Sequence, residues 1–155
     1  MRGLHLLAVF CVFSVALVVA DSPFLGTWKL NTAKSKGTAG TLSKEETVVF
    51  ASDGNGIKRT VTGIDGDGQP INMSATIPWD GMEHKVDGPN GAPPAMVAVK
   101  TVNANTLNVT MKVNDKRVLS GRVVLSKDGK TMTSSFKGED PKGRKIDNVE
   151  VYEKQ

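Results

Sequence analysis

The sequence is poor in cysteine and histidine, with one cysteine, Cys11, and two histidines, His5 and His84. Cys11 and His5 lie in an N-terminal stretch that we expect to be removed. The remaining chain then has no thiol for a disulfide, a metal or nucleophilic catalysis, and a single imidazole. Zinc sites usually need at least three nitrogen, sulfur or carboxylate ligands. We therefore expect no metal centre and no cofactor.

Aromatic residues are also scarce, at 5% of the chain. This argues against a stacking platform for sugars or single-stranded nucleic acid. The chain carries 20 lysines and arginines against 16 aspartates and glutamates, scattered singly along it. A phosphate-binding surface needs clustered basic residues, so we expect no nucleic-acid partner.

Long hydrophobic runs are missing except for Leu6 to Val19 near the N-terminus. Arg2 and His5 precede this run, and small residues end it before Asp21. This pattern predicts a secretory signal peptide over residues 1–20, cleaved after Ala20. Cys11 lies inside the run and not at the cleavage point, which argues against a lipid anchor. We expect a secreted or periplasmic protein that does not remain in the membrane, with an uncleaved anchor as the alternative.

Helical periodicity is absent from the rest of the chain. A single helical turn fits Ala33 to Lys36, but Gly37 and Gly40 oppose a longer helix. Residues 71–77 alternate apolar and polar side chains, as a half-buried strand does, and turns such as Asp53–Gly56 favour tight hairpins. The expected strands are 24–31, 45–51, 57–64, 71–77, 82–86, 96–102, 107–113, 117–125, 131–136 and 145–153.

Successive short strands with short connections predict an antiparallel meander. The edges of so long a sheet must be hidden, and closure into a barrel hides them. We predict an all-β, up-and-down barrel of about 8–10 strands, forming one domain over residues 21–155. Its opening strand, at 24–31, should pair with its last strand. A two-sheet sandwich is the alternative.

The opening strand carries the residues of a known motif, because Gly26 and Trp28 resemble the first-strand Gly-x-Trp motif of lipocalins and intracellular fatty-acid-binding proteins. Residues 151–154 resemble the closing strand of the latter. The chain from residue 21, including residues 126–131, is also similar to small secreted bacterial proteins described as lipocalin-like. The resemblance implies a barrel with a cavity for hydrophobic ligands.

The chain departs from these families at three places. It has no Thr-Asp-Tyr-like second lipocalin motif. Residues 32–43 are too short and glycine-rich for the two helices that fatty-acid-binding proteins place after their first strand. Those proteins hold the ligand carboxylate with Arg-x-Tyr, and the matching residues here are Glu150-Val151-Tyr152. A glutamate repels a carboxylate unless it is protonated or paired.

Charged residues on apolar strand faces are the most specific signals for a site. Arg59 and Arg122 each share a strand face with two aliphatic residues, and an inward arginine must be paired because an isolated buried charge is costly. Glu150 is a candidate partner. Two alternatives stay open: the arginines are exposed, or one packs on Trp28 in the cation–π contact that the resemblance implies.

The predicted ligand-binding residues combine these polar groups with inward apolar ones. Met73 and Met111 suit a surface that adapts to varied apolar partners, although ordinary core filling is an alternative. Trp79, at a turn, is expected to cap the sheet end, with gating of a cavity mouth as the alternative. The full predicted set is Arg59, Ile71, Met73, Val109, Met111, Arg122, Phe136, Glu150 and Tyr152.

No catalytic residues are predicted. His84 lies in a short strand without a nucleophile motif nearby, and Asp65-Gly66-Asp67-Gly68 is read as a hairpin turn and not as a calcium loop. The predicted function is a non-catalytic, monomeric barrel that binds a small hydrophobic or amphipathic molecule. The alternatives are a structural or interaction protein of the cell envelope with a self-filled barrel, and an isomerase or hydrolase of lipocalin-like fold.

Overall fold

The computed structural model describes residues 22–88, 93–140 and 142–155. The predicted signal peptide and part of the expected loop at 87–94 lie outside the described residues. Ten strands make up the fold. They are β1 (Gly26–Leu30), β2 (Glu45–Asp53), β3 (Gly56–Ile64), β4 (Pro70–Ile77), β5 (Asp80–Val86), β6 (Ala95–Asn103), β7 (Thr106–Val113), β8 (Lys116–Leu125), β9 (Thr131–Glu139) and β10 (Lys145–Lys154).

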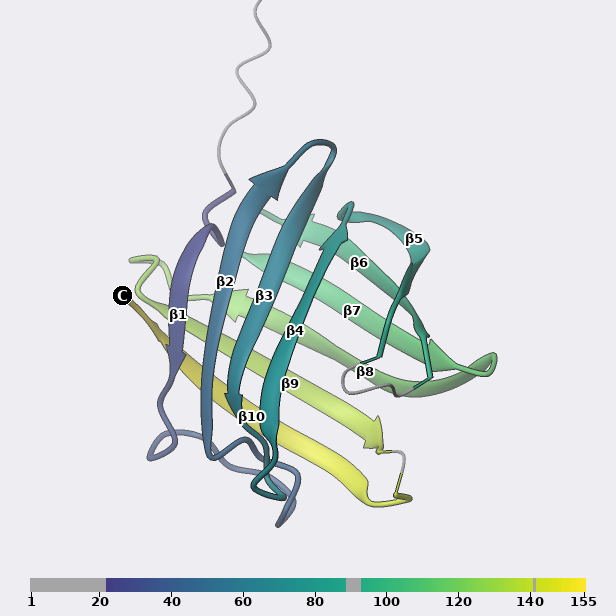
Figure 1. Cartoon of the computed structure of the whole chain (residues 1–155). Coiled ribbons are helices and arrows are strands. Elements are labelled where there is room, and N and C mark those ends of the chain that lie inside the picture. Colours follow the sequence, from purple (N-terminus) through teal and green to yellow (C-terminus); the bar gives the residue numbers. More distant parts are fainter. Residues whose placement is uncertain (1–21, 89–92, 141) are drawn as a thin grey trace, which may run out of the picture.

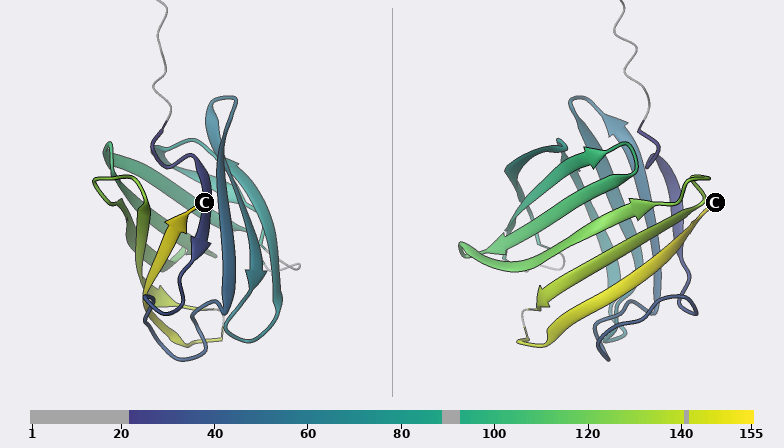
Figure 2. Two further views of the ribbon diagram at one scale, coloured as in Figure 1. Left: turned by 90° about the vertical axis from the view of Figure 1, so that its left-hand side faces the viewer. Right: turned by 180° about the vertical axis from the view of Figure 1, so that it is seen from behind.

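All ten strands belong to one antiparallel sheet with the order β4-β3-β2-β1-β10-β9-β8-β7-β6-β5. Chain neighbours pair throughout, except that β4 and β5 form the two ends of this order and β1 pairs with β10. The sheet curls so that β1–β4 lie in front of β6–β10 (Figures 1 and 2). The result is a nearly closed barrel with a gap between β4 and β5. This confirms the predicted meander barrel and the pairing of first and last strands.

The barrel has two distinct ends. At one end β1 begins and the β2–β3 turn and the β8–β9 turn lie close by (Figure 1). We call it the packed end. The opposite end, which we call the mouth, carries residues 31–44, the β3–β4 turn and the β9–β10 turn.

The packed end is filled by apolar side chains that alternate along the strands. Trp28 is fully buried and its indole Nε1 donates a hydrogen bond to the Phe24 carbonyl at 2.8 Å. Trp79 packs edge-on against Phe24 and Phe50, with ring centroids 5.5 and 5.8 Å apart. Trp79 thus helps to cap this end, in the role that we expect for it from the sequence.

The cation that packs on Trp28 is a lysine. The Lys154 Nζ lies 5.2 Å from the Trp28 ring centroid, within the range of a cation–π contact. Gly26 has a φ of +122°, where other residues are strained, and a Cβ there would lie 3.1 Å from the Lys154 side chain. The Gly-x-Trp residues therefore fit one local arrangement, in which glycine lets β1 pass close to the side chain on Trp28.

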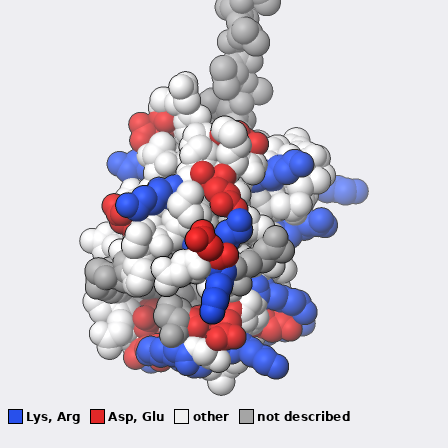
Figure 3. Space-filling model, turned by 90° about the vertical axis from the view of Figure 1, so that its right-hand side faces the viewer, with Lys and Arg blue, Asp and Glu red and all other residues white. Residues whose placement is uncertain are grey.

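Surface charges of both signs are interspersed on the face shown in Figure 3. The described part of the chain contains no helix with the length and hydrophobicity that a membrane crossing requires.

Replacing Trp28 with alanine should lower the free energy of unfolding by roughly 3–5 kcal/mol, the usual range for emptying a buried aromatic site. Chemical denaturation measures this change. Val102→Ala, at a side chain that is 48% exposed, is the control and should cost no more than about 0.5 kcal/mol. Equal effects of the two substitutions would show that the packed end does not stabilise the barrel.

Candidate ligand-binding site

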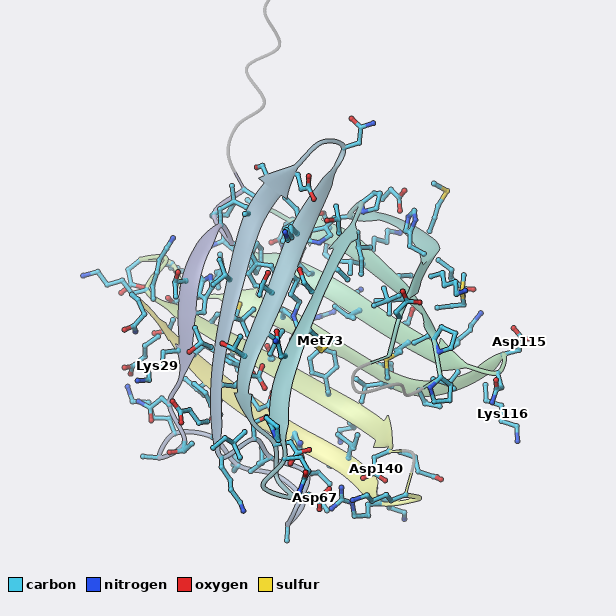
Figure 4. The ribbon with its side chains drawn as sticks, viewed as in Figure 1. Lys29, Asp67, Met73, Asp115, Lys116 and Asp140 are labelled. Atoms are coloured by element: carbon cyan, nitrogen blue, oxygen red, sulfur yellow. The ribbon has the colours of Figure 1, made fainter. Side chains whose placement is uncertain are left out.

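Between the packed end and the mouth, inward-facing apolar side chains remain partly accessible to solvent. The register places Met73 opposite buried Val61, and Met111 opposite Val97. Met73 lies at mid-height of the barrel (Figure 4). The partly buried inward residues include the predicted Ile71, Met73, Val109, Met111 and Phe136. Ile71, Met73, Val109 and Phe136 pack against the buried core and still keep some exposed surface.

A polar cluster interrupts this apolar lining. The Tyr152 hydroxyl lies 2.9 Å from Glu46 Oε1 and 3.0 Å from Glu150 Oε2. The Ser43 hydroxyl donates to Glu46 Oε2 at 2.8 Å. An Arg59 guanidinium nitrogen lies 3.8 Å from Glu46 Oε1. We call Glu46, Arg59, Glu150 and Tyr152 the interior polar cluster.

Strand alternation positions each member of the cluster. Glu46 has the same phase on β2 as buried Val48 and Phe50. Glu150 and Tyr152 share the inward phase of β10. Arg59 is opposite Phe50 in the β2–β3 pairing, and therefore also faces inward. The structure thus brings together three predicted site residues, Arg59, Glu150 and Tyr152.

The hydrogen bonds of the cluster require a proton on one carboxyl group. A phenol has a single proton to donate, so Tyr152 cannot donate to Glu46 and Glu150 at once. Burial and, second, the negative charge of Glu46 raise the pKa of Glu150 to about 7. Burial, with the two carboxyl groups nearby, raises the pKa of Tyr152 well above its usual value. Protonated Glu150 then donates to Tyr152, and Tyr152 donates to Glu46.

Arg59 has a different exposure from its partner. Its side chain is 42% exposed, whereas that of Glu46 is 9% exposed. Among the described residues, Glu46 is the one partner with which its guanidinium forms an ion pair or a hydrogen bond. The remaining N–H groups of Arg59 are therefore open to solvent or to a bound molecule.

Arg122 does not join the site, and its predicted place on the inner wall is not where the structure puts it. It is exposed and pairs in register with Asn108 and Ser135, and its Nε donates to Asn108 Oδ1 at 3.3 Å. The inward residues of β8 are its neighbours, including buried Val123. Arg122 instead borders a hollow of about 390 Å³ that also touches Lys137 and Asp147, which are exposed residues of β9 and β10.

Sequence reasoning missed Glu46 and Ser43. The signal for Glu46 is its phase with Val48 and Phe50, which places it on the inner face of β2. Ser43 precedes the strand, where strand phase gives no information.

The remaining polar candidates form local structure. His84 Nε2 lies 3.1 Å from Asp80 Oδ1. Asp65 Oδ1 accepts hydrogen bonds from the amides of Asp67 and Gln69 at 2.9 and 2.7 Å, which is the geometry of a turn and confirms the hairpin reading. Within residues 22–88, 93–140 and 142–155, no three histidine, aspartate or glutamate side chains gather as a metal site would require.

Ion pairs connect the loops at the mouth. The Arg144 guanidinium donates to both Asp67 oxygens at 2.9 and 3.0 Å, to Asp140 Oδ2 at 2.6 Å, and to the Gly40 carbonyl at 2.9 Å. Asp67 and Asp140 lie near each other at this end (Figure 4). Arg144 thus joins the β3–β4 turn, the β9–β10 turn and residues 31–44. Hydrogen bonds from Arg144 and then Lys142 lower the pKa of Asp67 to about 2.

Comparison with known proteins identifies the fold. No family model matches the sequence, and no curated protein matches it. A Schistosoma mansoni fatty-acid-binding protein in complex with arachidonic acid has 18% identity and a TM-score of 0.57, over 86% of this chain and 97% of its own. The fold is that of the fatty-acid-binding proteins.

Two further solved structures have the same fold. The zebrafish ileal bile-acid-binding protein, complexed with cholic acid, has 10% identity and a TM-score of 0.52, with 86% of this chain and 100% of that chain covered. An extracellular fatty-acid-binding protein has 14% identity and a TM-score of 0.53, with coverages of 86% and 97%. These identities are low, so the likeness concerns the fold.

Glu150 should make stability fall as the pH rises. Its pKa is about 7 in the fold against an ordinary 4.5, so between these values the folded protein keeps a proton that the unfolded chain has lost. By linkage, the free energy of unfolding decreases over this window, by up to roughly 3 kcal/mol. Glu150→Gln should remove this decrease and stabilise the protein at about pH 8. Denaturation at several pH values measures both effects.

The control for this prediction is Glu45→Gln, at the exposed neighbour of Glu46. The control should retain the decrease. A Glu150→Gln protein with the wild-type pH profile would contradict the proton assignment within the cluster.

Replacing Arg144 with glutamine should return the pKa of Asp67 from about 2 toward its ordinary value of 3.8, because the main hydrogen-bond donor to this carboxylate is lost. NMR titration of the Asp67 side chain measures the change. Lys137→Gln, which breaks only the exposed pair with Asp147, should leave the pKa of Asp67 unchanged. An unaltered Asp67 titration in the Arg144 variant would show that the mouth contacts do not persist in solution.

Proposed function

We propose that this protein is an exported, non-catalytic binding protein that holds a small hydrophobic or amphipathic molecule inside its barrel. The observation that carries the proposal is the partly buried apolar inner face, which includes Ile71, Met73 and Phe136 and lies beside the interior polar cluster. Ligand sites in proteins are mostly apolar, with a few placed polar groups that fix orientation. Met73 and Phe136 supply apolar surface, and Arg59 and Glu150 supply polar groups at the same level of the interior.

The structural neighbours support this proposal through their ligands. One neighbour holds arachidonic acid and another holds cholic acid. The apolar run from Leu6 to Val19 supports the exported part of the proposal. We expect the protein to be a monomer.

The second candidate is a structural or interaction protein of the cell envelope whose barrel holds no ligand. The observation in its favour is the packed end, where Trp28, Phe24 and Met132 fill the interior with the chain's own side chains. The two candidates differ in whether a molecule binds inside the barrel.

Native mass spectrometry of the gently purified protein, expressed from its full sequence in a host that exports it, separates these candidates. A reproducible excess mass that disappears on denaturation would identify a bound molecule. Addition of a neutral, apolar fluorescent dye should also give saturable emission. A protein with neither a bound mass nor saturable dye binding would favour the ligand-free barrel.

Filling the lining should abolish dye binding. Met73→Trp inserts a larger side chain into the interior and should weaken binding of the neutral dye by about tenfold or more, equivalent to about 1.4 kcal/mol. Met82→Trp is the matched control, because the Met82 side chain is 62% exposed, and it should bind the dye as the wild type does. Circular dichroism verifies that both variants fold. Equal dye binding by both would place the dye outside the barrel.

A further inference from the structure

Resting on the proposed function, we infer that the interior polar cluster selects a ligand with a cationic head group, an amphipathic amine, over one with a carboxylate. The inference comes from the balance of charges in the cluster. It contains two carboxyl groups, Glu46 and Glu150, and one cation, Arg59.

Arg59 forms an ion pair with only one of the two acids, and its charge acts on Glu150 from a greater distance. Its guanidinium lies 3.8 Å from Glu46, and Glu46 also accepts hydrogen bonds from Ser43 and Tyr152. Glu150 has Tyr152 as its hydrogen-bond partner at 3.0 Å, and no cation within salt-bridge distance among the described residues. A buried carboxylate without a counter-ion is costly and takes up a proton instead.

The groups that face Glu150 are few. Glu46 faces it from β2, Arg59 from β3 and Tyr152 from its own strand. The neighbouring strand β9 places Ser134, which is uncharged, opposite it. The site therefore lacks one positive charge beside Glu150, and the ammonium group of a bound amine would supply it.

A ligand with a carboxylate head group would be disfavoured at this site. It would add a third acidic group beside Glu46 and Glu150, and nearby negative charges disfavour the ionised form of a carboxyl group. Arg59 could attract it, but the positive charge of Arg59 already pairs with Glu46.

The pH dependence of amine binding follows from the proton that Glu150 must lose. An alkylammonium stays charged well beyond neutral pH, as a lysine side chain does. Glu150 must lose its proton to pair with it, and its pKa of about 7 means that this step opposes binding in acid. Affinity for the amine should rise about tenfold per pH unit at most below neutrality and level off above it. Affinity for a neutral alcohol should stay constant.

The test compares decylamine, decanol and decanoate, which share a tail and differ in head group. Each ligand displaces the neutral dye from the full-length protein at about pH 7.5. We expect decylamine to bind at least about tenfold more tightly than decanol, a difference of about 1.4 kcal/mol, and decanoate to bind more weakly than decanol. Decanoate binding most tightly, or equal affinities for all three, would overturn the inference while the proposed function stands.

Failure of the proposed function gives a different result, in which the dye itself does not bind.

Glu150→Gln should reduce the preference for decylamine over decanol to within about threefold, or about 0.7 kcal/mol, and remove its pH dependence. Glu150→Asp keeps the charge and should restore the preference, and Glu45→Gln should leave it intact. A preference that survives in Glu150→Gln would overturn the assignment to this cluster.

Discussion

The structure depends on the pairing of β1 with both β2 and β10. This strand has only five residues, yet it joins β2, the next strand of the chain, to β10, the last one. Leu30 pairs with Tyr152, and Lys29 pairs with Thr47, the residue after Glu46. Leu30 therefore lies between Glu46 and Tyr152, and the Tyr152 hydroxyl reaches across it. A shift of one residue in either register would turn one of these side chains to the outer face.

This closure explains why two acids meet inside an otherwise apolar barrel. Glu46 and Tyr152 are 106 residues apart in the sequence and belong to strands that do not pair with each other. The pairings of β1 with β2 and with β10 bring them together with Glu150. There, a proton and Arg59 balance the negative charges of the two carboxyl groups. Ser43, in the mouth segment 31–44, bonds Glu46, so the cluster extends toward the mouth. The Arg59 side chain of this cluster is 42% exposed, whereas Trp28 in the packed end is fully buried.

Alternation in the sequence predicted most of the fold and much of the lining. On β4, Ile71 and Met73 alternate with polar residues, so one face is clearly apolar. On β8 both faces carry aliphatic residues, so alternation does not distinguish the inner face from the outer one. The pattern allows Arg122 to face inward with Val124, although buried Val123 marks the inner face. The contact between Glu46 and Tyr152 was beyond prediction, because it depends on the registers of two strand pairs and not on any local pattern.

The mouth differs from the packed end in the kind of contact that holds it. Residues 31–44 form no helix; Lys36 pairs with Val149 through the backbone, and the Asn148 side chain bonds Thr38 and Thr41. Arg144 adds ion pairs that are screened by salt and individually weak at a surface. Apolar packing, in contrast, fills the end around Trp28. The contacts of the two ends thus differ in kind: buried apolar side chains at the packed end, and backbone pairing, side-chain hydrogen bonds and ion pairs at the mouth.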